Sequence, residues 1–170
     1  SDLATVLEVD PETGRQFRVE AHGGHFGGSL DGAALGLLEA REWKLALAES
    51  LTGGLLADAF VQVPGASKVL RGSVVAYATD VKHSVLGVEA DLLAQVGPVN
   101  PEVALAMAVG AANQLVADVA LATTGVAGPD EQDGNPVGTV FIALVTPIGS
   151  DVRALQLSGD RASIRNQAVE

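Results

Sequence analysis

The spacing of hydrophobic positions changes along the chain and divides it into two parts. Residues 1–20 alternate between apolar and polar side chains on either side of a turn-forming stretch at 10–14, which predicts a small β-hairpin. Residues 22–29, HGGHFGGS, are rich in glycine and predict a loop. A short helix over 33–41 completes what we expect to be an N-terminal leader of residues 1–42.

From residue 43 onward, short apolar runs typical of buried strands alternate with helical patterns. Asn100 followed by Pro101 is a strong helix start, because asparagine caps helices well and proline suits their first position. The alternation predicts an α/β fold, a three-layer α/β/α sandwich. The sheet should be mixed, because the last two strands are close enough to form a hairpin. The expected strands cover 44–48, 72–77, 119–124, 138–146 and 152–157. One expected helix follows the glycine pair and ends near 61, and the others cover 80–86, 89–96, 100–115 and 160–170.

Composition narrows the class of protein. The 170 residues are 48% hydrophobic, enough for one core, but no charge-free apolar run reaches the roughly 18 residues of a membrane span. The acidic N-terminal segment does not resemble a secretory signal, and the chain has no cysteine, so we expect a cytoplasmic protein. The net charge of −11 disfavours nucleic-acid binding.

The candidate chemistry begins with Ser50, which follows the first expected strand of the second part. Ligands gather at the carboxyl ends of strands in α/β folds, and a serine there lies near the amides of the next helix. Gly53 and Gly54 would let a substrate approach the backbone closely. The same serine could instead be a helix cap with no chemical role.

A serine nucleophile needs a base, and Lys82 is the better candidate. It follows the second expected strand of the second part, at the same sheet edge as Ser50, and a lysine can act as a base if burial lowers its pKa. A solvated surface lysine is the alternative. His22 and His25 could form half of a metal site but have no third ligand, so we expect no metal there.

A glycine-containing loop, TGVAGP at 124–129, follows the third of these strands. It matches neither the dinucleotide fingerprint nor the P-loop, but its amides could hold an anion or a carbonyl. Asp130, Glu131 and Asp133 just beyond it are interpreted as a solvated acidic loop rather than a metal site.

Taken together, these motifs resemble those of the CinA C-terminal domain family over residues 43–170. They share the family's order and spacing: AESLTGG at 48–54, VPGAS at 63–67, GSVVAY at 72–77 with Lys82, TGVAGP at 124–129 with PVGTV at 136–140, and GDR at 159–161 with Arg165. The chain departs from the family pattern at Leu51, where cysteine is frequent, and at Ala78, Thr79 and Asp80, where serine, asparagine and glutamate are common. The change at Thr79 could alter a substrate contact.

The resemblance implies an amidase that converts nicotinamide mononucleotide (NMN) to nicotinate mononucleotide and ammonia, with no metal or organic cofactor. It implies Ser50 as nucleophile and Lys82 as its base, with Tyr77 and Thr124 close by, and the family's habit suggests a homodimer. A non-catalytic nucleotide-binding or protein-interaction module that kept the fold is the alternative. The expected substrate-binding residues are Glu49, Thr52, Gly53, Gly54, Thr124, Gly125, Ala127, Gly128, Arg161 and Arg165, with Arg161, Arg165 or the 125–128 amides facing the phosphate.

Overall fold

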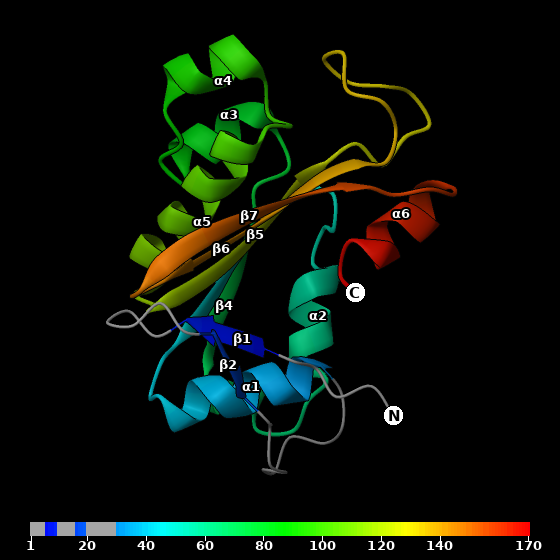
Figure 1. Ribbon diagram of the computed structural model, residues 1–170. Coiled ribbons are helices and arrows are strands. Elements are labelled where there is room, and N and C mark those ends of the chain that lie inside the picture. The colour runs from blue at the N-terminus through cyan, green and yellow to red at the C-terminus, as the bar shows by residue number, and fades with distance from the viewer. Residues whose placement is uncertain (1–5, 10–15, 20–29) are drawn as a thin grey trace.

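The computed structural model describes residues 6–9, 16–19 and 30–170, and its centre is a five-stranded sheet (Figure 1). The strand order is β4 (Leu70–Val75), β3 (Leu45–Glu49), β5 (Val119–Gly125), β6 (Thr139–Thr146) and β7 (Gly149–Gln156). Strands β4, β3 and β5 are parallel, whereas β6 and β7 run antiparallel as a hairpin. The predicted mixed sheet is therefore confirmed.

Helices cover both faces of this sheet and form the outer two layers of the predicted sandwich (Figure 1). One face carries α3 (Thr79–Ser84), α4 (Ala90–Val96) and the longest described helix, α5 (Pro101–Leu115). The opposite face carries α1 (Leu30–Ala40), α2 (Leu55–Val61) and α6 (Arg161–Gln167). A short 3₁₀ helix, Ala66–Lys68, precedes β4.

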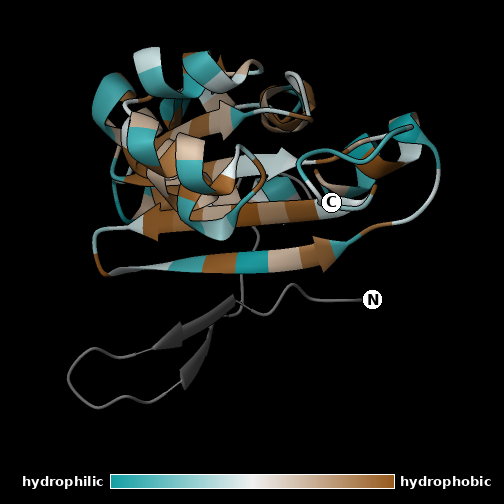
Figure 2. Ribbon diagram, turned by 90° about the horizontal axis from the view of Figure 1, so that it is seen from above, coloured by the Kyte–Doolittle hydropathy of each residue, from teal (hydrophilic) through white to brown (hydrophobic). Residues whose placement is uncertain are grey.

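The core has a different composition on each face of the sheet. On the α5 face it is built largely of alanines from β3, β5 and α5 around Met107, and small side chains let the helix approach the sheet closely. Gly110 of α5 lies so near the Leu86 carbonyl that a Cβ there would be 1.9 Å from its oxygen. The other face is filled by larger side chains, Leu35, Leu45, Leu47, Phe60 and Val69 among them. Hydrophobic positions concentrate on the sheet and hydrophilic ones on the outer helix surfaces (Figure 2).

The leader is described in part. Strands β1 (Val6–Val9) and β2 (Gln16–Val19) pair antiparallel, which confirms the predicted hairpin, whereas its turn and the glycine-rich loop lie outside the described residues. The leader's helix, α1, starts earlier than predicted, and its Leu35 is completely buried against β3.

Several element boundaries differ from those predicted. Strand β4 begins at Leu70 and ends at Val75, which leaves Tyr77 in the connection to α3. Strand β7 starts at Gly149, so the β6–β7 hairpin is longer than expected. The cap at Asn100 is as predicted, since its side chain accepts a hydrogen bond from the Glu102 amide at 2.8 Å. Among the described helices, none is long and apolar enough to cross a membrane.

Candidate active site

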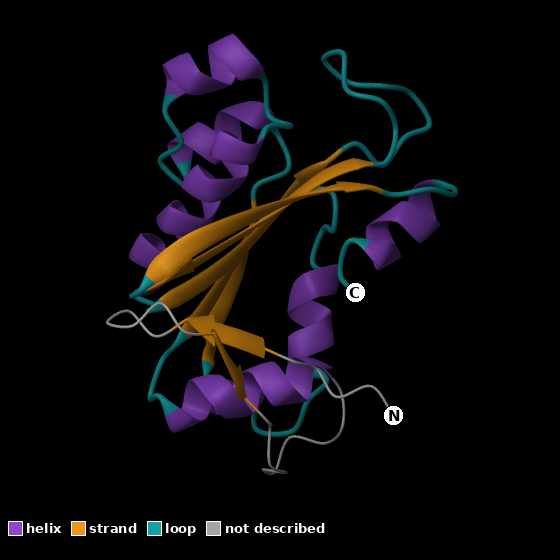
Figure 3. Cartoon of the chain, in the orientation of Figure 1, coloured by secondary structure: helices purple, strands orange, loops and turns teal. Residues whose placement is uncertain are grey.

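The three parallel strands place the candidate residues at one edge of the sheet. Ser50 follows the last residue of β3, Tyr77 lies two residues beyond the end of β4, and Thr124 is near the end of β5. Parallel strands share their carboxyl edge, so segments distant in sequence meet there. The loops at this edge, including the long one between β5 and β6, extend beyond the sheet (Figure 3).

Ser50 and Lys82 form a direct pair. The Lys82 Nζ donates a hydrogen bond to the Ser50 Oγ at 2.9 Å, and it also donates to the backbone carbonyls of Ala76 at 2.7 Å and Tyr77 at 3.2 Å. Lys82 is 1% exposed and Ser50 is 7% exposed. The predicted juxtaposition of the two residues is therefore present, on a lysine that is buried rather than solvated.

The surroundings of Lys82 suit a base. Burial removes its ammonium from water and lowers its pKa from 10.5 to about 8. A protonated lysine has three N–H donors, which match its three acceptors. A neutral lysine keeps two donors, so the two carbonyls can take both and the lone pair then faces the Ser50 hydroxyl.

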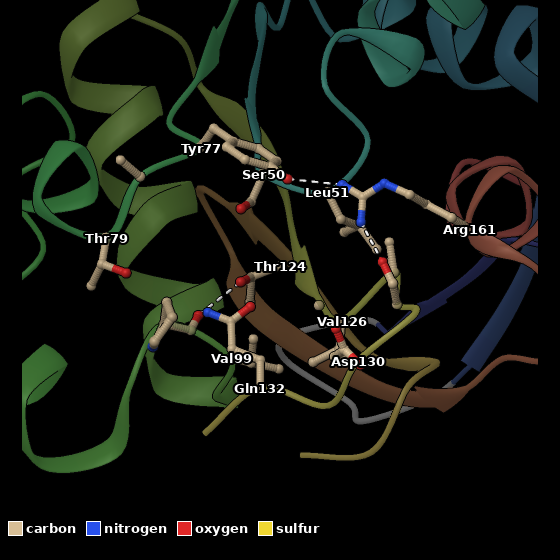
Figure 4. Close-up of a pocket in the computed structure, with 15 residues that line it drawn as sticks. Ser50, Leu51, Tyr77, Thr79, Val99, Thr124, Val126, Asp130, Gln132 and Arg161 are labelled. Atoms are coloured by element: carbon tan, nitrogen blue, oxygen red, sulfur yellow. Dashed lines mark hydrogen bonds between the residues drawn. The ribbon is translucent and has the colours of Figure 1, made fainter. Parts of the chain in front are cut away.

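A cavity of about 390 Å³ opens beside Ser50 (Figure 4). Its wall combines the serine turn, the segment after β4, the start of α6 and the loops around 98–99 and 124–132. The predicted site residues that line it are Ser50, Tyr77, Thr124, Gly125, Ala127, Gly128 and Arg161.

Arg161 is the cation of this pocket. Its guanidinium donates to the Tyr77 hydroxyl at 2.9 Å and to the Gly128 carbonyl (Figure 4). Tyr77 is 61% exposed, and its ring stands at the pocket rim while its backbone carbonyl holds Lys82. Tyr77 therefore connects the Ser50–Lys82 pair with the one arginine among the described pocket residues.

Glu49 and Thr52 point into the protein and do not line the pocket. The buried Glu49 carboxylate accepts hydrogen bonds from the amides of Gly54, Leu56 and Ala57 at 2.9–3.2 Å, and from the hydroxyls of Thr52 and Ser73 at 2.7 and 2.8 Å. It thus caps α2, and Thr52 continues the network to Thr123 at 2.9 Å.

Gly53, Gly54 and Arg165 also lie outside the pocket lining, around the turn that follows Ser50. Both glycines have positive φ, 56° and 102°, which explains the glycine pair. The Gly53 amide donates to the Ser50 carbonyl at 3.1 Å, so it is engaged within the turn. Arg165 donates to the carbonyls of Leu51 at 2.8 Å and Thr52 at 3.2 Å.

The loop after β5 forms the opposite wall. Thr124 donates to the Pro98 carbonyl at 2.7 Å, so its hydroxyl fixes the loop before α5. Gly125 is required by the close approach of β6, since a Cβ there would lie 2.7 Å from the Thr139 carbonyl oxygen. The amides of Ala127 and Gly128 donate to no acceptor in the described part of the chain.

Several pocket residues were not predicted. Thr79, Val99, Asp130 and Gln132 line the cavity, and Asp130 brings a carboxylate to its wall (Figure 4). The acidic residues Asp130, Glu131 and Asp133 are exposed, as expected for a solvated loop, and Asp130 also lines the pocket. Within the described residues, no group of three or more histidines or acidic residues is placed to hold a metal ion; His22 and His25 lie outside them.

Comparison with known proteins agrees with this architecture. A family model described as the CinA C-terminal domain matches residues 29–170. The chain belongs to the CinA C-terminal domain family. The match starts before the boundary expected at residue 43, so it includes α1.

Individual relatives of this CinA C-terminal domain support the assignment. A CinA-like protein from Frankia casuarinae is 52% identical over 149 residues, covering 86% of this chain and 34% of the relative. A putative competence-damage inducible protein from Desulforamulus reducens is 48% identical over 125 residues, covering 74% of this chain and 30% of the relative. The chain thus spans about a third of the length of these curated relatives.

Solved structures have the same fold. A CinA superfamily protein from Escherichia coli superposes with a TM-score of 0.79 at 33% identity, covering 82% of each chain. One from Enterobacter cloacae gives 0.76 at 26% identity, covering 89% of this chain and 92% of the other. The sheet and its helical layers therefore belong to a known architecture.

Proposed function

We propose that this domain is a serine amidase that hydrolyses the carboxamide of NMN, giving nicotinate mononucleotide and ammonia. The observation that carries the proposal is the buried Lys82 amine at 2.9 Å from the Ser50 hydroxyl, beside an open pocket. Its family membership and the resemblance in motifs support NMN as the substrate.

In the first step, the neutral Lys82 amine accepts the Ser50 proton while Oγ bonds to the carboxamide carbon. Negative charge moves onto the carbonyl oxygen, and nearby backbone amides stabilise it. The Gly53 amide is engaged by the Ser50 carbonyl, so the amides of Leu51 and Thr52, which have no acceptor in the described residues, take this role.

In the second step, protonated Lys82 gives its proton to the leaving nitrogen, and the carbon–nitrogen bond breaks. Ammonia leaves, and an ester joins Ser50 to the nicotinoyl group. Lys82, neutral again, removes a proton from water, which attacks the ester and regenerates the Ser50 hydroxyl.

The remaining pocket groups suit the rest of NMN. Its phosphate is an anion in a protein of net charge −11, so binding requires local compensation. The Arg161 guanidinium and the unengaged amides of Ala127 and Gly128 supply it from one wall. Asp130, on the same loop, can face the positively charged pyridinium ring.

Release of ammonia from NMN by the purified protein tests the proposal, with Ser50→Ala as the matched control. The wild type should release ammonia with turnover, and Ser50→Ala should lose at least about 10³-fold in kcat because the nucleophile is gone. Binding of NMN by the wild type without ammonia release would refute the amidase and favour a non-catalytic nucleotide-binding module.

A further inference from the structure

A buried carboxylate, that of Glu49, and a half-buried guanidinium, that of Arg165, both bind peptide groups of the turn that carries Ser50. Glu49 accepts hydrogen bonds from amides of the following turn and helix, at Gly54, Leu56 and Ala57. Arg165 of α6 binds carbonyls instead, with its Nε 2.8 Å from the Leu51 oxygen and its Nη2 3.2 Å from the Thr52 oxygen. The guanidinium therefore fixes the orientation of two consecutive peptide groups directly after the nucleophile.

That orientation decides where the amides point. In a trans peptide the carbonyl and the following N–H point in opposite directions. Since the Leu51 carbonyl faces Arg165, the Thr52 N–H faces away from it, and since the Ser50 carbonyl accepts from Gly53, the Leu51 N–H faces away from that contact. Neither N–H has an acceptor among the described residues.

We infer that Arg165 is a positioning residue for the oxyanion donors. Its bond to the Leu51 carbonyl holds the Thr52 amide directly. Its bond to the Thr52 carbonyl holds the Gly53 peptide group, whose amide binds the Ser50 carbonyl and so orients the Leu51 amide. The inference rests on the proposed serine chemistry and assigns Arg165 a task other than contact with the substrate phosphate. Arg165 does not line the pocket, so it acts through the turn.

Two further observations indicate that Arg165 positions the turn after Ser50 and does not merely anchor α6. The helix is already anchored by Ile164 and Ala168, which are buried with Leu51 and Val140, so its docking does not depend on the guanidinium alone. At Gly53 a Cβ would lie 3.1 Å from the Arg165 Nη2. The absence of a side chain at that position leaves the guanidinium room to reach both carbonyls.

The test follows covalent labelling of Ser50 by a fluorophosphonate probe with mass spectrometry. In this reaction Oγ bonds to phosphorus, fluoride leaves, the serine proton passes to Lys82, and the phosphoryl oxygen occupies the oxyanion position. We compare the wild type with Arg165→Met, with the charge-preserving Arg165→Lys, and with Gln167→Leu. Gln167 is the matched control, because it also ties α6 to a backbone carbonyl, that of Ser158 at 2.7 Å.

We expect Arg165→Met to lower the maximal labelling rate on the order of 10²-fold, as loss of an oxyanion donor does, and Gln167→Leu to stay within about twofold of wild type. The labelling rate of Arg165→Lys should lie between those of the wild type and Arg165→Met, because an ammonium lacks the planar guanidinium geometry that binds two carbonyls at once. The pH midpoint of the labelling rate of Arg165→Lys should equal that of the wild type, because the Ser50–Lys82 contact is intact. For any variant that hydrolyses NMN, kcat should fall much more than KM rises.

Labelling of Arg165→Met within threefold of the wild type would overturn the inference. A fall of equal size in Gln167→Leu, or a displaced pH midpoint in Arg165→Lys, would also overturn it by showing a general structural effect. A wild type that does not label at Ser50 would overturn it too. A wild type that labels at Ser50 but releases no ammonia from NMN would refute the proposed substrate and leave the comparison of variants valid.

Discussion

At the scale of residues, the proposed chemistry depends on one lysine that is neutral over part of the physiological pH range. Lys82 is buried with two backbone carbonyls and the Ser50 hydroxyl around its amine, and burial lowers its pKa to about 8. Since the base must accept a proton, only the neutral form is competent. The catalytic activity proposed for Ser50 and Lys82 is therefore expected to depend on pH.

The value of kcat/KM for NMN should rise with pH with one midpoint near 8. Below it, the neutral fraction of Lys82 falls about tenfold per pH unit, and activity should fall with it. The pH–rate profile of the wild type checks this, and Lys82→Met should be inactive across the same range. Activity that is constant between about pH 6 and 9 would contradict a lysine base.

Arg161 should contribute mainly to binding. Its guanidinium lies on the pocket wall, so Arg161→Ala should raise KM for NMN on the order of tenfold or more, through loss of a charge-assisted contact with the phosphate. Steady-state kinetics measure this, and nicotinamide riboside, which lacks the phosphate, is the matched substrate. If KM for NMN stays within twofold, Arg161 does not bind the phosphate.

The proximity of Ser50 and Lys82 could be predicted from the sequence because short apolar runs show where buried strands end. Ser50 and Lys82 each follow an apolar run, and parallel strands bring such positions to one edge. The direction of individual side chains could not be read. Glu49 and Thr52 lie next to Ser50 in the chain but turn inward. Arg165 is on α6 with Arg161, yet it contacts the turn after Ser50 instead of the pocket.

At the scale of elements, α2 has an unusual cap. Its first amides bind a glutamate carboxylate from the end of β3, which also receives hydroxyls from Thr52 and Ser73. One side chain thus joins β3, β4 and α2 directly beside Ser50. Sequence periodicity locates the strand and the helix but gives no sign of this shared cap.

Glu49→Gln should lower the free energy of unfolding by about 2 kcal/mol, because the amide nitrogen cannot accept the hydrogen bonds that the lost oxygen received. Denaturant unfolding measures the change. The control is Glu102→Gln, at an exposed carboxylate in the first turn of α5, which should change stability by less than about 0.5 kcal/mol. Equal effects of the two substitutions would refute the capping role.

At the scale of the whole molecule, the pocket is built from residues between Ser50 and Arg161, and the family match begins at residue 29. Alternating patterns were enough to predict the three layers and the mixed sheet. The path of the 126–138 loop depends on long-range contacts with β6 and the segment before α5, which no local pattern encodes.

Deletion of residues 1–28 should leave kcat for NMN within about threefold of wild type, because none of the described pocket residues belongs to that segment. Solubility or association should change more than chemistry. Kinetics together with size-exclusion chromatography separate the two effects. A large fall in kcat in a variant that keeps its fold and oligomeric state would show that the leader takes part in the site.

Ser50 is proposed to form a covalent bond with the substrate, and rapid quenching during turnover of NMN tests this most directly. Mass spectrometry of the quenched protein should find a nicotinate mononucleotide ester on the peptide that contains Ser50, and none in Ser50→Ala. Turnover without that ester, together with more than about a tenth of the wild-type kcat in Ser50→Ala, would contradict a serine nucleophile and indicate direct attack by an activated water.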